Sequence, residues 1–144
     1  MSRAEMSATL ARADRDELIS VINHLLHVNS QLQVEVVRSP EIGTVQLQVR
    51  EPVCEERFII ADGLATVAEV LIDGTMGWAM RLGSDPEAAT AAAIADSLVA
   101  MNSEVTELWR LYEFASAAEV LDKSVKNEHL RRLLGTAINF EELD

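Results

Sequence analysis

Apolar residues recur at helical spacing through the first thirty positions of the chain. Ser2 and Asp14 each stand three residues before a glutamate, which is the spacing of a helix-capping pair. Leu18, Ile22 and Leu25 then fall on one face of a 3.6-residue period. We therefore expect a short helix that begins after Ser2 and a longer, amphipathic helix that begins after Asp14.

From Gln31 onward the apolar period changes to two, which is typical of β-strands. Alternation or strand-forming composition recurs in five short runs, at residues 32–36, 45–49, 57–61, 67–72 and 76–82. Breaks are expected at Ser39-Pro40, Pro52 and Asp62-Gly63. Asp73-Gly74, between the last two runs, favours a two-residue hairpin turn. The short connections predict an antiparallel meander of about five strands.

The last of these runs separates two kinds of side chain. The even-numbered residues from Met76 to Leu82 are large and apolar, whereas Gly77, Ala79 and Arg81 face the other way. Asp85 with Pro86 behind it predicts the start of a helix. The alanine-rich stretch that follows would allow this helix to approach a sheet closely.

The C-terminal third of the chain is expected to be helical. Ser103 can cap a helix whose apolar stripe includes Leu108, Trp109 and Tyr112, and residues 130–134 predict a last helix. This stripe either completes the chain's own core or offers Leu108, Trp109 and Tyr112 to a partner. The prediction is an α+β fold with two N-terminal and two or three C-terminal helices. It forms one domain, 1–144, with a core at 1–101 and a helical extension at 102–144.

Composition narrows the class of protein. The 144 residues include 12 Lys and Arg against 24 Asp and Glu, so the net charge is −12. Such an acidic chain is not expected to bind nucleic acid or an anionic membrane surface. One cysteine, Cys54, excludes a disulfide framework or an iron–sulfur cluster built within this chain. No apolar run is long enough to span a membrane and no secretory signal is present, so we expect a cytoplasmic protein.

Candidate catalytic and metal-binding groups are sparse. The chain has no glycine-rich phosphate-binding motif. His24 and His27 are three residues apart, but both project away from the apolar stripe, which favours an exposed polar face over a metal site. Acidic neighbours disfavour a reactive thiolate at Cys54. The acids between Glu51 and Asp73 form either a solvated rim or a face for a basic partner. We expect no cofactor or metal on this chain.

The central part of the sequence carries a family pattern. In order, it reads Val36-Val37-Arg38, Glu41-Ile42-Gly43, Val45-Gln46, Glu56-Arg57-Phe58, Asp73-Gly74-Thr75-Met76-Gly77-Trp78, Leu82-Gly83-Ser84-Asp85 and Ala95-Asp96. With these spacings the chain resembles PhnG, the G subunit of the bacterial carbon–phosphorus lyase system, over roughly residues 3 to 101. The sequence departs from the family at 51–55, which lacks the usual glycine-rich stretch, at 66–68, which lacks a Thr-Arg pair, and at Ser84, where Arg is common.

The resemblance implies a subunit of a complex that degrades organophosphonates. In that system the G subunit works with the I subunit, with H and L alongside, to replace the adenine of ATP with an alkylphosphonate. The product is a ribose 1-alkylphosphonate 5-triphosphate, and the J subunit later cuts the carbon–phosphorus bond. Because this chain lacks a phosphate cradle, we expect the site for ATP and Mg²⁺ to lie mainly on a partner, and the chain alone to be inactive.

Specific residues follow from this reading. Glu41 and Asp73 are the candidates for an acid that faces a cationic ribosyl transition state. Arg38, Arg57 and Asp85 are partner-facing candidates, together with the C-terminal stripe. The alternative functions are a non-enzymatic scaffold unrelated to phosphonate metabolism and a free-standing small-molecule binding domain. In isolation the chain could form a homo-oligomer.

Overall fold

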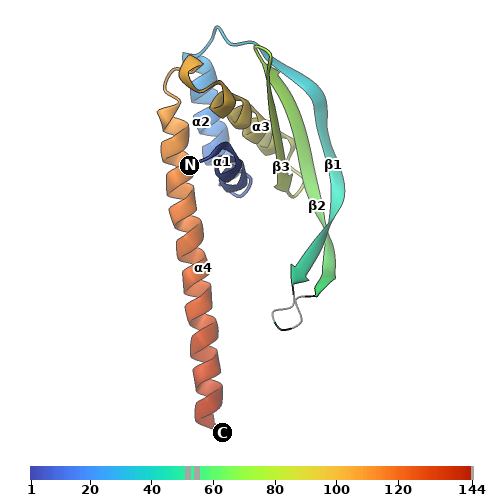
Figure 1. Cartoon of the computed structure of the whole chain (residues 1–144), viewed down its shortest axis with the longest axis vertical. Coiled ribbons are helices and arrows are strands. Elements are labelled where there is room, and N and C mark those ends of the chain that lie inside the picture. Colours follow the sequence, from blue (N-terminus) through green and yellow to red (C-terminus); the bar gives the residue numbers. More distant parts are fainter. Residues whose placement is uncertain (51–52, 54–55, 144) are drawn as a thin grey trace.

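The computed structural model describes residues 1–50, 53 and 56–143. Within them the chain forms one sheet of strand order β1-β2-β3, with all the helices on one of its faces (Figure 1). The elements are α1 (Arg3–Leu10), α2 (Arg15–Val28), β1 (Val34–Arg50), β2 (Arg57–Ile72), β3 (Thr75–Leu82), α3 (Pro86–Met101), a 3₁₀ turn (Asn102–Glu104) and α4 (Trp109–Leu143). The predicted α+β class is confirmed.

The two N-terminal helices begin where the capping pairs place them. The Ser2 hydroxyl accepts a hydrogen bond from the Glu5 main-chain N–H at 3.2 Å. The Asp14 carboxylate accepts one from the Glu17 N–H at 3.0 Å. Both side chains therefore satisfy N–H groups that a helix start leaves without intrahelical partners.

The sheet has three long strands where the sequence predicted about five short ones. β1 continues through Pro40, because β1 is an edge strand and its register shifts on both sides of Arg38 absorb a residue that cannot donate. β2 continues through Asp62 and Gly63, which pair with Gln46 and Val45 instead of forming a turn. The predicted breaks at Ser39-Pro40 and Asp62-Gly63 were wrong because pairing with a neighbouring strand outweighed local turn propensity. Pro52, the third predicted break, lies outside the described residues, in the connection between β1 and β2.

The predicted hairpin between β2 and β3 is confirmed. Asp73 and Gly74 have φ angles of 45° and 84°, and Ile72 pairs with Thr75 across them. Two successive positive φ angles are the geometry of the turn that matches strand twist, and glycine adopts them without strain. The two strands that this turn joins, β2 and β3, therefore pair antiparallel, as the sequence predicted.

Helix α3 packs on the face of β2 and β3 that carries small residues. Ala68 and Ala79 are buried there, and the close approach is tightest at Gly77. A β-carbon at Gly77 would stand 2.0 Å from the Ala93 carbonyl oxygen, so no other residue fits without moving α3. Apolar side chains of α1 and α2, including Leu18, cover the outer side of α3 and complete the core.

The segment after Asn102 differs from the expectation in its details. Ser103 lies within the 3₁₀ turn. Leu108 of the first predicted stripe precedes α4, while the rest of that stripe and the second stripe belong to one helix, α4. The buried residues of this segment are Val105, Leu108, Leu111 and Ala115. Its first part thus completes the chain's own core, while α4 continues well beyond the body of the protein (Figure 1).

Candidate functional site

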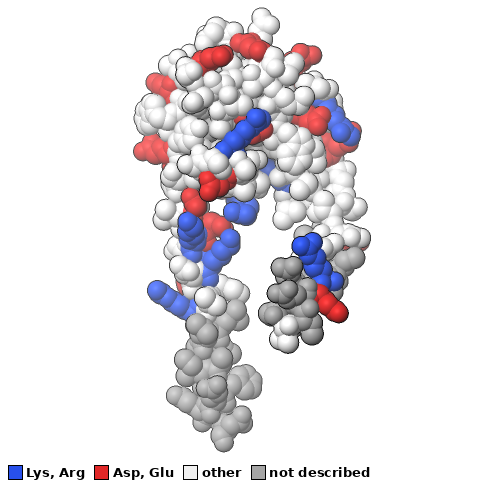
Figure 2. Space-filling view, viewed as in Figure 1, with Lys and Arg blue, Asp and Glu red and all other residues white. Residues whose placement is uncertain are grey.

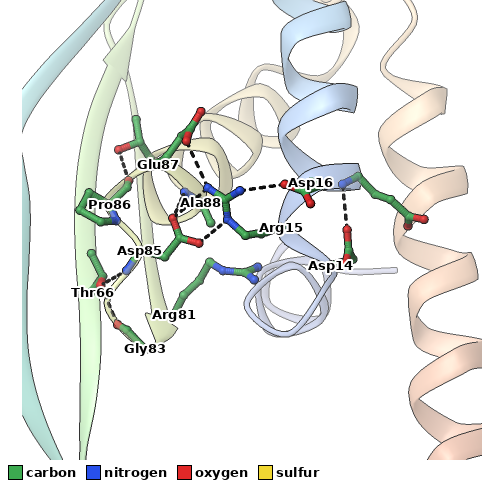
Figure 3. A network of polar contacts seen from close by, with 12 residues as sticks. Asp14, Arg15, Asp16, Thr66, Arg81, Gly83, Asp85, Pro86, Glu87 and Ala88 are labelled. Carbon is green, nitrogen blue, oxygen red and sulfur yellow. Dashed lines mark hydrogen bonds and ion pairs between the residues drawn. The ribbon is translucent and has the colours of Figure 1, made fainter.

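A polar network surrounds the start of α3 (Figure 3). The Asp85 carboxylate accepts hydrogen bonds from the Ala88 N–H at 3.1 Å and from Arg15 Nε at 2.6 Å. Thr66 Oγ1 accepts from the Asp85 N–H at 3.1 Å and donates to the Gly83 carbonyl at 2.7 Å. The network therefore joins α2, β2 and α3, and it assigns Asp85 a structural role at the helix start.

The arginines of this network are engaged by carboxylates and main-chain groups of the same chain. The Arg15 guanidinium, together with the Ala88 N–H, holds the pKa of Asp85 below its ordinary value. Arg15 also pairs with Glu87 at 3.1 Å, and its own pKa is raised by these carboxylates. Arg81 donates to two main-chain carbonyl oxygens at the end of α1 and just before α2, and burial lowers the pKa of Arg81. Both guanidinium groups are thus engaged within the chain.

A second ion pair lies at the free edge of β3. Arg3 holds the two carboxylate oxygens of Asp96 at 2.9 Å each, from Nε and Nη2. Asp96 Oδ2 also accepts from the Trp78 N–H at 3.0 Å, while Arg3 Nη2 donates to the Met76 carbonyl at 3.0 Å. The pair therefore occupies two main-chain groups that an edge strand would leave open, and it fixes α1 and α3 against β3.

The face of the sheet that carries no helix is apolar along β3. Because Gly77 and Ala79 point toward α3, the alternate side chains Met76, Trp78 and Met80 point to solvent, as does Leu82. Figure 1 shows no element over this side of the sheet. We call the set Met76, Trp78, Met80 and Leu82 the open apolar face.

The two acids proposed as catalytic candidates lie far apart. Glu41, in β1, forms an ion pair with Arg38 at 2.7 Å and pairs opposite Val67. Asp73 lies in the hairpin turn after Ile72, where its side chain accepts from the Gln33 N–H at 3.0 Å. Val67 and Asp73 are six residues apart, which at about 3.3 Å per strand residue places these acids roughly 20 Å apart. The structure does not bring them together as an acid pair.

The remaining candidates occupy different environments. Arg57 is exposed at the start of β2. Leu108 is buried in the core, Tyr112 is half-buried against it, and Trp109 is 57% exposed with the Arg110 guanidinium 4.8 Å from its ring centre. Of the C-terminal stripe, Trp109 thus keeps its ring available to a partner. Cys54 lies outside the described residues.

Within the part of the chain that the structure describes, no group of three His, Cys, Asp or Glu residues lies close enough to hold a metal ion. His24 Nε2 lies 2.8 Å from a Glu107 carboxylate oxygen, so this histidine joins α2 to the segment before α4. The surface hollows include grooves of about 350 Å³ between α2 and α3 and about 400 Å³ between α2 and α4. The first is apolar and includes Ile22 and Ile94 in its lining.

Charge is distributed unevenly over the surface (Figure 2). Acidic side chains are scattered over the body of the protein in the upper part of the view, whereas Lys and Arg gather lower down, where α4 and the β1–β2 ribbon project. On α4 most of these cations are paired along the helix, as Lys126 is with Asp122 at 3.0 Å. None of the helices in the described residues combines the length and the apolar character that crossing a membrane requires.

Sequence reasoning missed the Arg3–Asp96 and Arg15–Asp85 pairs. Their members stand 93 and 70 residues apart, so no local spacing links them. The alternation in β3 did separate the open apolar face from the small residues. The alternation did not indicate which of the two faces of β3, the one with large apolar residues or the one with small residues, a helix would cover.

Fold and surface together define a small α+β domain with internally paired arginines and one uncovered, apolar sheet face. The family model of the phosphonate metabolism protein PhnG matches residues 1–143. The chain therefore belongs to the PhnG family, and its role lies in phosphonate metabolism. The match extends through the C-terminal segment, beyond the region in which the sequence pattern was recognised.

Proposed function

We propose that the chain is an accessory subunit of the carbon–phosphorus lyase core complex in the cytoplasm. In this function it supports the transfer that replaces the adenine of ATP with an alkylphosphonate. The site for ATP and Mg²⁺ lies mainly on a partner, with the I subunit as the first partner and H, J and L as further members of the complex. The family membership supports the pathway, and the surface of this chain supports the accessory role.

The observation that carries the accessory role is the engagement of the arginines. Holding a triphosphate takes clustered cationic groups, a glycine-rich cradle of N–H groups, or both, together with Mg²⁺. Six arginines of the body instead bind groups of this same chain: Arg3, Arg12, Arg15, Arg38, Arg81 and Arg110. Recruiting Arg3, Arg15 or Arg81 to a phosphate would break contacts between distant elements of the fold.

The contribution of this chain to the chemistry is correspondingly small. Glu41 and Asp73 are too far apart to act as a pair, so a single acid at most would face the ribosyl centre on the partner. Glu41 is already paired with Arg38, and Asp73 binds the Gln33 main chain. In this proposal the chain braces the partner's site instead of supplying its reactive groups.

Adenine release from ATP in the presence of methylphosphonate tests this function. The chain alone should release no adenine, and the I subunit alone should release little. Mixing the two, with H and L added in turn, should form a complex that co-elutes in size-exclusion chromatography and releases adenine. Full activity of the I, H and L subunits without this chain would contradict the accessory role, and so would turnover by the pure chain.

A further inference from the structure

The open apolar face exposes four large apolar side chains that are next to one another. The four side chains of β3 are exposed to 49% at Met76, 43% at Trp78, 40% at Met80 and 66% at Leu82. Across the sheet, the register places Leu71 beside Met76 and Val67 beside Met80 on the same face. Contiguous exposed patches of this kind, centred on Trp and Met, mark protein interaction sites on soluble proteins.

The exposure of this face follows from the packing of α3. A strand usually buries its larger side chains, but here the Gly77 and Ala79 side is covered, because α3 approaches too closely for anything larger. Exchanging the two faces would require α3 to move outward. The fold therefore leaves large apolar side chains in solvent. Binding of a second protein would bury them and gain the hydrophobic free energy that folding alone does not.

Acidic residues border this patch along β1 and β2. By register, Glu35, Glu41 and Glu69 share the open face with Arg38 in the described part of the sheet that lies beside β3. Arg38 is engaged by Glu41 through two hydrogen bonds, of 3.0 and 2.7 Å. Among the described residues, Glu35 and Glu69 form no ion pair. The border of the patch is thus acidic. Glu69 lies opposite Arg38 and is attracted to it, but Arg38 forms its ion pair with Glu41.

Trp78 and Glu69 are direct neighbours across the β2–β3 ladder. Side chains of such a pair stand about 5 Å apart on one face. An arginine from another protein could stack its guanidinium on the Trp78 ring while forming an ion pair with the Glu69 carboxylate. This neighbouring pair gives the patch a specific cation-binding element at its centre.

We propose that the open apolar face docks a partner subunit whose contacting surface has an apolar centre flanked by Arg or Lys, with one arginine against Trp78 and Glu69. A second copy of this chain fits poorly, because a symmetric contact would bring the acidic borders together, and the cation that borders the patch in the described residues, Arg38, is already engaged by Glu41. The inference rests on the proposed function for the identity of the partner, the I subunit, and adds the surface that binds it.

The two tryptophans of the chain allow a direct test. Trp78 lies on the open apolar face, whereas Trp109 is exposed at the start of α4. Trp109→Phe leaves Trp78 as the reporter, and Trp78→Phe leaves Trp109. Acrylamide quenching of each full-length variant is measured with and without a tryptophan-free I subunit. Binding should protect Trp78 from the quencher and shift its emission to shorter wavelength, with little change at Trp109. Protection of Trp109 alone would overturn the inference.

Charge reversal on the same face provides a second measurement. Glu69→Lys should weaken binding by at least about tenfold and Trp78→Ala by about 30-fold. Glu104→Lys, a matched change of charge at an exposed site on the 3₁₀ turn, should leave binding within about twofold. Circular dichroism checks that each variant is folded. Equal effects of Glu69→Lys and Glu104→Lys would overturn the proposed contact.

Two further outcomes separate this inference from the proposed function. Concentration-dependent protection of Trp78 without any partner would overturn the inference in favour of a second copy. Binding of the I subunit that protects Trp78, combined with equal adenine release by the partner subunits with and without this chain, would support the docking surface and contradict the proposed function. Absence of any complex with the I subunit would contradict both.

Discussion

Gly77 sets the distance between α3 and the sheet, and Gly77→Ala should destabilise the protein strongly. The added β-carbon would lie 2.0 Å from the Ala93 carbonyl oxygen and 2.8 Å from the Ser97 main-chain nitrogen. These are main-chain atoms of a helix, so no side-chain rotation relieves the clash. Ordinary contact begins at 3.4 Å, so α3 would have to move by about 1.4 Å.

Such a movement would also disturb two hydrogen bonds between α3 and β3. Ser97 Oγ donates to the Thr75 carbonyl at 2.8 Å, and Asp96 accepts from the Trp78 N–H at 3.0 Å. Overpacking of a core costs about 1–3 kcal/mol and each lost hydrogen bond about 1 kcal/mol. The free energy of unfolding should therefore fall by roughly 3–5 kcal/mol, a large fraction of the 5–15 kcal/mol typical of a domain.

Urea unfolding followed by far-ultraviolet circular dichroism measures this loss. Gly43→Ala is the matched control, because it lies in the same sheet and its β-carbon would meet nothing within 4 Å. The control should change stability by no more than about 1 kcal/mol. If Gly77→Ala also unfolds within about 1 kcal/mol of the wild-type protein, α3 does not approach the sheet as described, and the reason given for the open apolar face fails with it.

Two further predictions concern polar groups that join elements. The buried Asn29 side chain binds the Leu25 carbonyl and both main-chain groups of Thr106, so Asn29→Ala should lower the free energy of unfolding by about 2–4 kcal/mol in the same urea assay. The pKa of Asp85 is lowered in the folded state, so its charge stabilises the protein above the unfolded-state value near 4, and that contribution is lost as the pH falls through the folded-state pKa. Asp85→Asn should therefore be less stable than wild type at pH 7, and the difference should shrink at acidic pH; a constant difference from pH 7 to pH 2 would contradict this.

The elements of the fold that local chemistry determines were predictable from the sequence. The caps at Ser2, Asp14 and Asp85, and the turn at Asp73-Gly74, depend on residues within three positions of each other, and the structure has them as expected. Strand ends were not predictable in the same way. Pro40 lies inside β1 because β1 is an edge strand, and that status depends on the whole sheet.

The candidate site was predictable to a smaller degree. Alternation in β3 separated Trp78 and Met80 from Gly77 and Ala79, but burial depends on α3, which follows later in the chain. Leu108 and Trp109 are neighbours in the predicted stripe, yet Leu108 is in the core and Trp109 is exposed, because the packing of the segment that leads into α4 decides between them. In both cases, packing between elements that are distant in the sequence determines which residues are buried.

The ion pair between Arg3 and Asp96 affects the tendency of the free protein to aggregate. β3 is an edge strand with a hydrophobic face, a combination that recruits strands of other molecules into aggregates. Because Asp96 and Arg3 occupy the Trp78 N–H and the Met76 carbonyl, an incoming strand cannot continue a regular ladder along β3. Removing the first residues of the chain would free the Met76 carbonyl, whereas Asp96 of α3 would still accept from the Trp78 N–H. The N-terminal residues therefore provide one of the two contacts that keep β3 from pairing with a strand of another molecule.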